Sequence, residues 1–167
     1  MLDFELTQEQ KALVDTTRKF VKDKILPIAA KCDHESSFPH DVFKEAWELG
    51  LVAPNIPQEY GGAGLSEVDH VLLTEELAYG CTGIQTSMTA NALAAAPIMI
   101  AGNDAQKAKY PGMLTDEPVY ASYALTEPGA GSDAAGIQTR CTQHGDDWVL
   151  NGQKVYITNA SWAKWFI

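Results

Sequence analysis

The hydrophobic pattern of this chain changes near residue 118, from the spacing of helices to the short runs of strands. Before that point, apolar residues such as Leu13 and Phe20 recur with polar residues between them at helical spacing. After Pro118, short runs of aromatic, β-branched and small apolar residues alternate with turn residues. The sequence therefore predicts an α+β chain: an N-terminal all-α helical domain (residues 1–118), then an incomplete antiparallel β-barrel-like domain (residues 119–167).

Start and stop signals predict five helices in the first part of the chain. Thr7-Gln-Glu-Gln10 is a capping box, in which the threonine and glutamine side chains satisfy each other's backbone amides. Pro27 is expected to kink or end this first helix, because proline removes a donor and clashes with the preceding turn. The other helices are expected over residues 39–49 with Gly50 as a stop, from Ser66 to Gly80, over residues 83–100, and after a cap at Asn103, with a loop over residues 51–65.

The second part contains signals for strands and for a hairpin. Residues 119–126 and 137–142 are expected as strands. Asn151-Gly152 is a strong two-residue hairpin signal, so residues 148–150 and 154–158 are expected to pair across it. The last residues, 164–167, are typical of a strand that is beginning.

Composition and charge exclude several classes of function. The formal net charge of −10 opposes binding to nucleic-acid phosphates and to anionic membrane surfaces, and no basic cluster offsets it. Three separated cysteines and four histidines give neither a disulfide framework nor metal-ligand spacing, so no metal site is expected. The N-terminus shows no secretion signal, and the apolar run 90–101 is too short to span a bilayer.

The loop Gly129-Ala-Gly131-Ser-Asp-Ala134 formally fits the dinucleotide-binding pattern G-x-G-x-x-A. That pattern has its meaning only between a strand and a helix, and here β-type sequence follows it. The dinucleotide fold is therefore not expected. Taken alone, the loop could equally be an ordinary turn, since glycine permits tight turns and close backbone approach.

Two longer segments are far more specific than the glycines alone. They are Tyr123-Ala-Leu-Thr-Glu-Pro-Gly-Ala-Gly-Ser-Asp133 and Asn151-Gly-Gln-Lys-Val-Tyr-Ile-Thr-Asn159. Together they resemble the acyl-CoA dehydrogenase family. The resemblance extends through the chain, and the segments 46–51, 75–83 and 100–104 look most like the medium-chain members.

The resemblance implies a binding site for FAD. The aromatic side chain of Tyr156 would pack on the flavin face away from the substrate, where medium-chain members usually have tryptophan. Without the family, Tyr156 could equally be a core aromatic of a β-sheet. The residues that the resemblance assigns to the cofactor are Tyr123, Ala124, Leu125, Thr126, Gly131, Ser132, Tyr156, Ile157 and Thr158.

The resemblance also implies a pocket for the acyl chain along the fourth helix. Gln85, Thr89 and Leu93 recur every four residues and so share one helix face. Medium-chain members commonly carry glutamate where Thr89 stands and glycine where Ala90 stands, which alters the pocket floor. The alternative for these residues is ordinary core packing. The residues assigned to substrate are Ser132, Gln85, Thr86, Thr89 and Leu93.

The implied function is FAD-dependent dehydrogenation of a saturated acyl-CoA to trans-2-enoyl-CoA, with electrons passed to electron-transfer flavoprotein. The family's catalytic glutamate has no counterpart in these 167 residues, and Glu127 is expected to be structural. Two alternatives stay open: a truncated non-catalytic helical or oligomerisation module, and an acyl-CoA oxidase-type flavoenzyme of the same fold.

The resemblance further implies partners and a location. Leu13, Leu51 and Leu73 match a surface patch where family members dock electron-transfer flavoprotein, although plain core packing is an equal alternative. Full-length members are usually homotetramers. The expected location is the bacterial cytoplasm or the mitochondrial matrix, without secretion.

Overall fold

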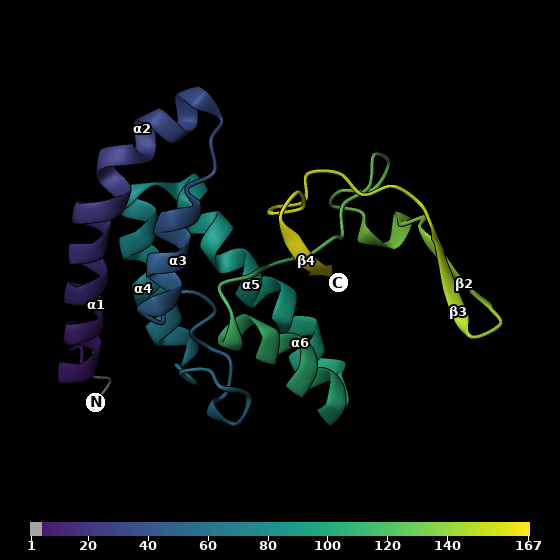
Figure 1. Cartoon of the computed structure of the whole chain (residues 1–167), viewed down its shortest axis with the longest axis horizontal. Helices are drawn as coiled ribbons and strands as arrows, with labels where there is room; N and C mark the ends of the chain where they lie inside the picture. Colours follow the sequence, from purple (N-terminus) through teal and green to yellow (C-terminus); the bar gives the residue numbers. More distant parts are fainter. Residues whose placement is uncertain (1–4) are drawn as a thin grey trace.

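The computed structural model describes residues 5–167, which form a helical body followed by a smaller β part (Figure 1). The helices are α1 (Gln8–Phe20), the π-helical turn η1 (Val21–Ile25), α2 (Leu26–Glu35), α3 (His40–Glu48), the 3₁₀ turn η2 (Gln58–Tyr60), α4 (Glu67–Gly80), α5 (Thr82–Ala101) and α6 (Asp104–Asp116). The β part contains β1 (Tyr120–Ser122), the 3₁₀ turn η3 (Ala134–Gly136), β2 (Arg140–His144), β3 (Asp147–Asn151) and β4 (Ala163–Phe166). This order confirms the predicted α+β class.

The predicted starts of α1, α4 and α6 are confirmed, whereas α2 after Pro27 was not predicted. Capping boxes open α1 at Thr7, α4 at Ser66 and α6 at Asn103, and in each the cap side chain accepts from the third helical amide. α3 ends at Glu48, and Gly50, two residues later, has a φ of 72°. The amide after it bonds back to the Ala46 carbonyl at 2.9 Å, which closes a Schellman-type turn.

The break predicted at Pro27 lies in the turn immediately before it. η1 replaces the regular α-helical hydrogen bonds, and the Leu26 amide reaches back five residues to the Val21 carbonyl. Pro27 then occupies the first turn of α2, where its missing N–H costs nothing. Gly80 packs against this turn, since a Cβ there would lie 2.6 Å from a methyl carbon of Val21.

α5 is the central helix of the fold. It packs against α4, α6 and β1, and its faces bury Ile84, Met88 and Ala95 in the core. Asn91 is fully buried on this helix, and its amide donates to the Val119 carbonyl and accepts from the Ala121 amide, both at 2.8 Å. One side chain thus holds the first strand against the helical body.

The strands form two separate pairs. β2 and β3 are antiparallel, as expected, but β1 and β4 are parallel, with Ala121 opposite Trp165. The predicted strand over residues 119–126 is regular only over β1. Beyond Ser122 the chain stays extended without a ladder, while its Ala124 amide bonds to the Ile167 carbonyl at 2.8 Å.

The hairpin turn predicted at Asn151-Gly152 is wrong. The strands reverse at Gly145-Asp146, with His144 opposite Asp147, and Asn151 is the last paired residue of β3. Gly145 has a φ of 66°, which a two-residue turn requires at its first position. Gly152 instead packs closely on Thr139, where a Cβ would lie 2.1 Å from the hydroxyl oxygen. Residues 154–158 therefore form no strand and leave the hairpin for the helical body.

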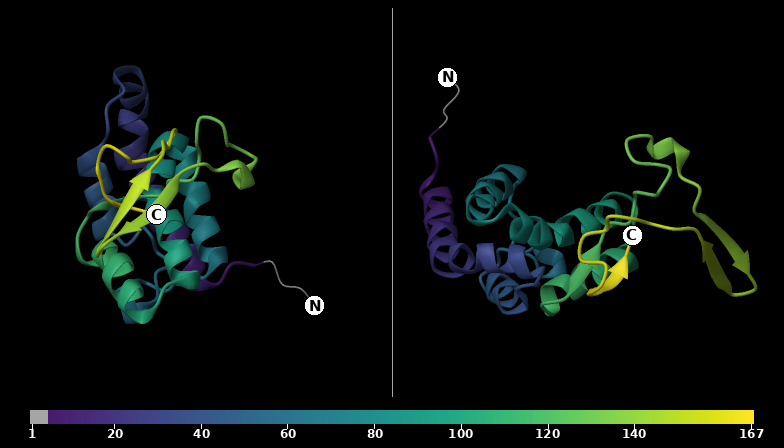
Figure 2. Two further views of the ribbon diagram at one scale, coloured as in Figure 1. Left: turned by 90° about the vertical axis from the view of Figure 1, so that its right-hand side faces the viewer. Right: turned by 90° about the horizontal axis from the view of Figure 1, so that it is seen from above.

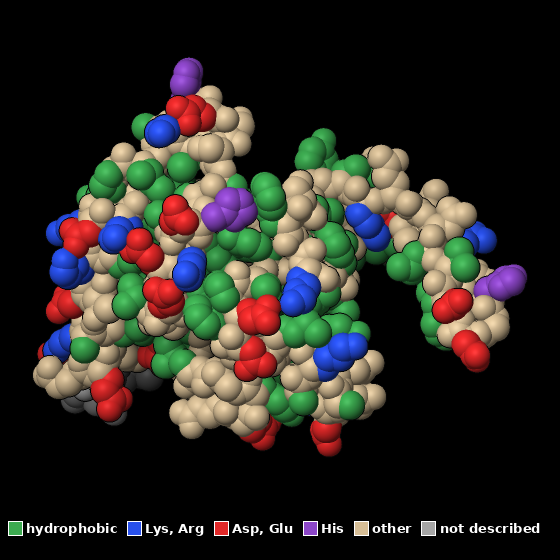
Figure 3. Space-filling view, in the orientation of Figure 1, with side chains coloured by type: hydrophobic (Ala, Val, Ile, Leu, Met, Phe, Trp, Pro, Cys, Tyr) green, Lys and Arg blue, Asp and Glu red, His purple; other side chains and the backbone are tan. Residues whose placement is uncertain are grey.

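The hairpin extends away from the helical body as an arm (Figure 2). Every residue of β2 and β3 is exposed, including Trp148 and Leu150. Over the helical body, acidic and basic side chains are interspersed on the face drawn in Figure 3. No helix within residues 5–167 is long and apolar enough to cross a membrane.

Replacing Asn91 with alanine should destabilise the fold by about 3 kcal/mol, because a buried carbonyl and a buried amide of the Val119–Ala121 segment lose their partners. Urea unfolding followed by circular dichroism measures this change. Ile100 on the same helix is 83% exposed and gives the control, since Ile100→Ala should change the unfolding free energy by less than about 0.5 kcal/mol. Equal losses of unfolding free energy in the two variants would contradict the role of Asn91 in holding β1.

Candidate functional site

Two segments far apart in sequence lie side by side at the junction of the helical body and the arm. The Val155 amide donates to the Thr126 carbonyl at 3.0 Å, and the Lys154 ammonium donates to the Leu125 carbonyl at 2.8 Å. The Ser122 hydroxyl donates to the Thr158 carbonyl at 2.7 Å. We call residues 123–126 and 156–158, which these bonds hold together, the wall.

Tyr156 is the most unusual residue of the wall. Its side chain is 94% exposed, so it belongs to no sheet core formed by residues 5–167. Its backbone has a φ of 58°, a conformation that costs a tyrosine of the order of 1 kcal/mol or more. A large aromatic held by strained backbone with nothing packed on it offers a flat surface for a further group.

The other wall residues leave polar groups free. Within residues 5–167, the backbone amides of Leu125 and Thr126 and the hydroxyls of Thr126 and Thr158 make no hydrogen bond. All three residues are partly exposed. The wall therefore combines an aromatic face with unpaired donors, and such a surface fits a flat, polar heterocycle.

Glu127, the residue after the first wall segment, supports the wall through hydrogen bonds and an ion pair. Its buried carboxylate accepts from the Gln138 amide at 2.7 Å and the Thr139 amide at 3.0 Å, and it pairs with Lys154 at 2.9 Å. Hydrogen bonds from Thr139, from the Gln138 amide and from Lys154 lower the pKa of Glu127 to about 2. This carboxylate is ionised and fully engaged, which agrees with its expected structural role.

The glycine loop after the wall is open. Gly131 and Ser132 are exposed, and a Cβ on Gly131 would meet no atom within 4 Å. Only the single turn η3 follows, and then β2, so no helix stands where a dinucleotide fold requires one. Ser132 lines none of the hollows that contain the other predicted substrate residues.

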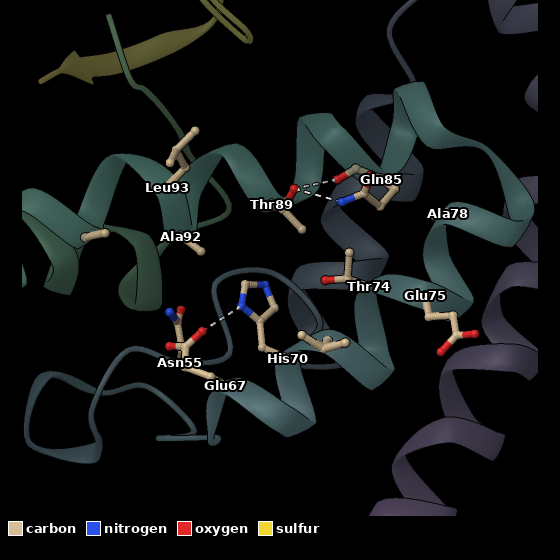
Figure 4. Close-up of a pocket in the computed structure, with 12 residues that line it drawn as sticks. Asn55, Glu67, His70, Thr74, Glu75, Ala78, Gln85, Thr89, Ala92 and Leu93 are labelled. Carbon is tan, nitrogen blue, oxygen red and sulfur yellow. Dashed lines mark hydrogen bonds and ion pairs between the residues drawn. The ribbon is translucent and has the colours of Figure 1, made fainter. Parts of the chain in front are cut away.

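α4 and α5 enclose a groove of about 800 Å³. Gln85, Thr89 and Leu93 line it from α5 (Figure 4), and the Gln85 amide donates to the Thr89 hydroxyl at 3.0 Å. Thr86 does not line the groove, since it lies on the exposed strip of α5 and its hydroxyl donates to the Thr82 carbonyl. The structure thus brings three of the four predicted α5 residues together.

The α4 side of the groove adds residues that sequence reasoning missed. His70 and Thr74, one helical turn apart, point toward α5 (Figure 4). The spacing of these two polar residues on a helix expected from Ser66 to Gly80 could have indicated them. Glu67 and Glu75 also line the groove, and none of its lining residues is a lysine or an arginine.

The proposed surface patch of three leucines is not a surface patch. Leu73 is 0% exposed and Leu51 is 2% exposed, while Leu13 is partly buried against the same core. Core packing, the alternative left open above, is what the structure shows for Leu51 and Leu73.

Within residues 5–167, no three histidine, cysteine, aspartate or glutamate side chains gather in a way that could hold a metal ion. The three cysteines are free thiols. The candidate site consists of the three features described so far: the wall, the glycine loop and the groove.

The chain matches two family models. Residues 7–117 match the acyl-CoA dehydrogenase N-terminal domain, and residues 122–167 match the acyl-CoA dehydrogenase middle domain. A probable medium-chain specific acyl-CoA dehydrogenase 2, mitochondrial, from Caenorhabditis briggsae is 46% identical over 165 residues, which are 99% of this chain and 40% of that protein.

Solved structures agree with these matches. Acyl-CoA dehydrogenase from Bacillus anthracis in complex with FAD superposes with a TM-score of 0.90 and 36% identity, over 100% of this chain and 29% of that one. Butyryl-CoA dehydrogenase from Megasphaera elsdenii gives a TM-score of 0.89 and 33% identity, over 97% of this chain and 44% of that one. The chain spans less than half the length of each of these relatives.

Glu127 should contribute stability that depends on pH. Because its folded-state pKa of about 2 lies below the ordinary value of 4.5, the contribution is complete above about pH 5 and is lost as the pH falls toward 2. Unfolding midpoints of the wild type and Glu127→Gln should therefore differ most at pH 6 and approach each other only as the pH falls to about 2. The exposed Glu117, which pairs with Lys164 at 3.3 Å, gives the control Glu117→Gln, whose difference from wild type should be small throughout.

Proposed function

This chain belongs to the acyl-CoA dehydrogenase family, and from that premise we propose that it supplies the flavin wall and the acyl groove of an enzyme that converts a saturated acyl-CoA to trans-2-enoyl-CoA. The observation that carries the proposal is that hydrogen bonds hold together two segments that carry the exposed ring of Tyr156 and the unpaired hydroxyls of Thr126 and Thr158. A buried sheet aromatic would have needed no such arrangement.

The wall residues have separate tasks in this proposal. The ring of Tyr156 stacks on the isoalloxazine, and the Thr126 and Thr158 hydroxyls and nearby amides donate to its polar edge. FAD, when bound, supplies the acceptor for the hydride that leaves the β-carbon of the acyl chain. Around it lie Tyr123, Ala124, Leu125 and Ile157 of the wall, with Gly131 and Ser132 toward the phosphates and the pantetheine arm.

The acyl chain is proposed to run from the wall over the exposed strip of α5 into the groove. Thr86 and Leu93 lie on that strip, seven residues apart and hence on nearly the same line of the helix. Gln85 and Thr89 follow on the side that faces α4. This path accounts for the place of Thr86 outside the groove itself.

The base that removes the α-proton is not assigned to these residues. Glu127 is the carboxylate next to the wall, and three hydrogen-bond donors occupy it. A pKa lowered to about 2 makes it too weak a base for proton abstraction from a thioester. The proposed enzyme therefore draws its base from a segment of the full-length protein that is not among these residues.

The remaining parts of the proposal concern assembly. Electrons leave for an electron-transfer flavoprotein, the full-length protein is a homotetramer, and the location is the bacterial cytoplasm or the mitochondrial matrix. Their support is family membership alone. A division of the chain near residue 118 is supported by the end of α6 at Asp116 and the start of β1 at Tyr120.

Titration of the chain with FAD tests the wall. Bound flavin should lose fluorescence by stacking on Tyr156, and Tyr156→Ala should weaken binding about 3- to 10-fold, which corresponds to a stacking contribution of about 0.5–1.5 kcal/mol. Tyr79 is also highly exposed but lies on α4, so Tyr79→Ala is the matched control and should bind as the wild type does. An identical loss in both variants, or no flavin binding at all, would count against the proposed wall.

The charge of the groove predicts which acyl chains it accepts. Glu67 and Glu75 line it without a lysine or an arginine, so a chain that ends in a carboxylate meets repulsion. The full-length enzyme should turn over a methyl-ended acyl-CoA with a kcat/KM about 10-fold above that of a carboxylate-ended acyl-CoA of equal length. The Glu67→Gln, Glu75→Gln double variant should narrow this ratio, whereas an unchanged ratio would place the acyl end elsewhere.

A further inference from the structure

Asn159 ends the second wall segment in an unusual way. Its backbone has a φ of 63°, so two left-handed residues, Tyr156 and Asn159, bracket Ile157 and Thr158. Asparagine tolerates this conformation better than most residues. The Asn159 carbonyl then accepts from the Trp162 and Ala163 amides, both at 2.9 Å, and so begins the turn into β4.

The side chain of Asn159 reaches the helical body. Its amide nitrogen donates to the Ser87 carbonyl of α5 at 2.8 Å, across 72 residues of sequence, and the residue is 8% exposed. Ser87 is one helical turn before Asn91, whose side chain holds β1 from the same face of α5. Two amide side chains therefore attach β1, which precedes the first wall segment, and Asn159, which follows the second, to one line of α5.

The opposite face of α5 lines the groove. With about 100° per residue, Ser87 lies roughly 140–160° around the helix from Gln85, Thr89 and Ala92, which line the groove, and Asn91 lies roughly 100–160° from them. The hydrogen bond from Asn159 to Ser87 therefore also sets the distance from the wall to the groove. The bond from Asn159 joins α5 to the very segment that carries Tyr156 and Thr158.

We propose that Asn159 is a positioning residue that sets the register of Tyr156 and Thr158 against α5, and thereby the placement of the flavin relative to the acyl groove. This inference rests on the proposed function. The residue acts through two properties that can be separated: its amide bond to Ser87 and its left-handed backbone. Within residues 5–167, the side chains of Tyr156 and Thr158 make no hydrogen bond to the helical body themselves.

A merely structural role would show mainly as lost stability. The other amide atom of Asn159, Oδ1, is buried without a partner, so truncation removes an unpaired acceptor together with one hydrogen bond. These two effects on unfolding oppose each other. The placement of residues 156–158 against α5, in contrast, responds to the lost hydrogen bond and not to the unpaired acceptor, so flavin binding should change more than the unfolding midpoint.

The test compares Asn159→Gly, which keeps the left-handed backbone and loses the amide, with the wild type. Both are titrated with FAD, and the fluorescence that remains at saturation reports how well Tyr156 stacks. Asn159→Gly should keep an unfolding midpoint close to the wild type, bind FAD about 10-fold more weakly, and leave the bound flavin less quenched. Asn159→Asp, which keeps the shape but turns a carboxylate oxygen toward the Ser87 carbonyl, should also bind and quench FAD less well, and its unfolding midpoint should fall because the new charge is buried.

Ser36 provides the matched control. It is an exposed residue with a φ of 51° at the end of α2, so Ser36→Gly places glycine in the same backbone conformation away from the wall. Its affinity and quenching should equal those of the wild type. If Asn159→Gly binds and quenches FAD as the wild type does, the positioning role is overturned while the flavin site stands. If the wild type binds no FAD, the proposed function fails and this inference fails with it.

Discussion

The structure depends most on the buried amide of Asn91. A strand that packs against the side of a helix has no ladder partner on that side, so its carbonyl and amide groups must find partners elsewhere. One asparagine supplies an acceptor and a donor at once, at 2.8 Å each, from the middle of the most buried helix. With β1 fixed in this way, β4 can pair with it in parallel and bring the C-terminal residues back to the helical body.

Around the wall, the supporting residues are fully hydrogen-bonded, whereas the residue proposed to contact the flavin is exposed. Glu127 is saturated with donors, and Lys154 bonds both this carboxylate and the Leu125 carbonyl. A few residues away, Tyr156 stands exposed on strained backbone. Strain of this kind persists only when neighbouring bonds determine the conformation, and the bonds at Thr126, Leu125 and Thr158 do so here.

The helices could be predicted because their signals are local. Each capping box or terminal glycine acts within about four residues, so Thr7, Ser66 and Asn103 mark their helices without tertiary information. The strands could not be predicted equally well, because pairing depends on distant partners. Asn151-Gly152 and His144-Gly-Asp-Asp147 both carry turn residues, and the sequence does not show that Gly152 packs on Thr139 while the chain reverses at Gly145-Asp146.

The candidate site divides in the same way. Family resemblance gave the residues of the wall, and helical spacing gave one face of α5, but neither gave the burial of Leu51 and Leu73 or the exposure of Tyr156. Exposure is set by what the rest of the fold covers, and a sequence pattern does not contain it. The wall and the groove occupy different faces of α5. A change of residue at position 89 can therefore reshape the groove, while the bonds at Ser87 and Asn91 keep the wall in place. This separation allows one helix to vary the acyl pocket without disturbing the flavin surface.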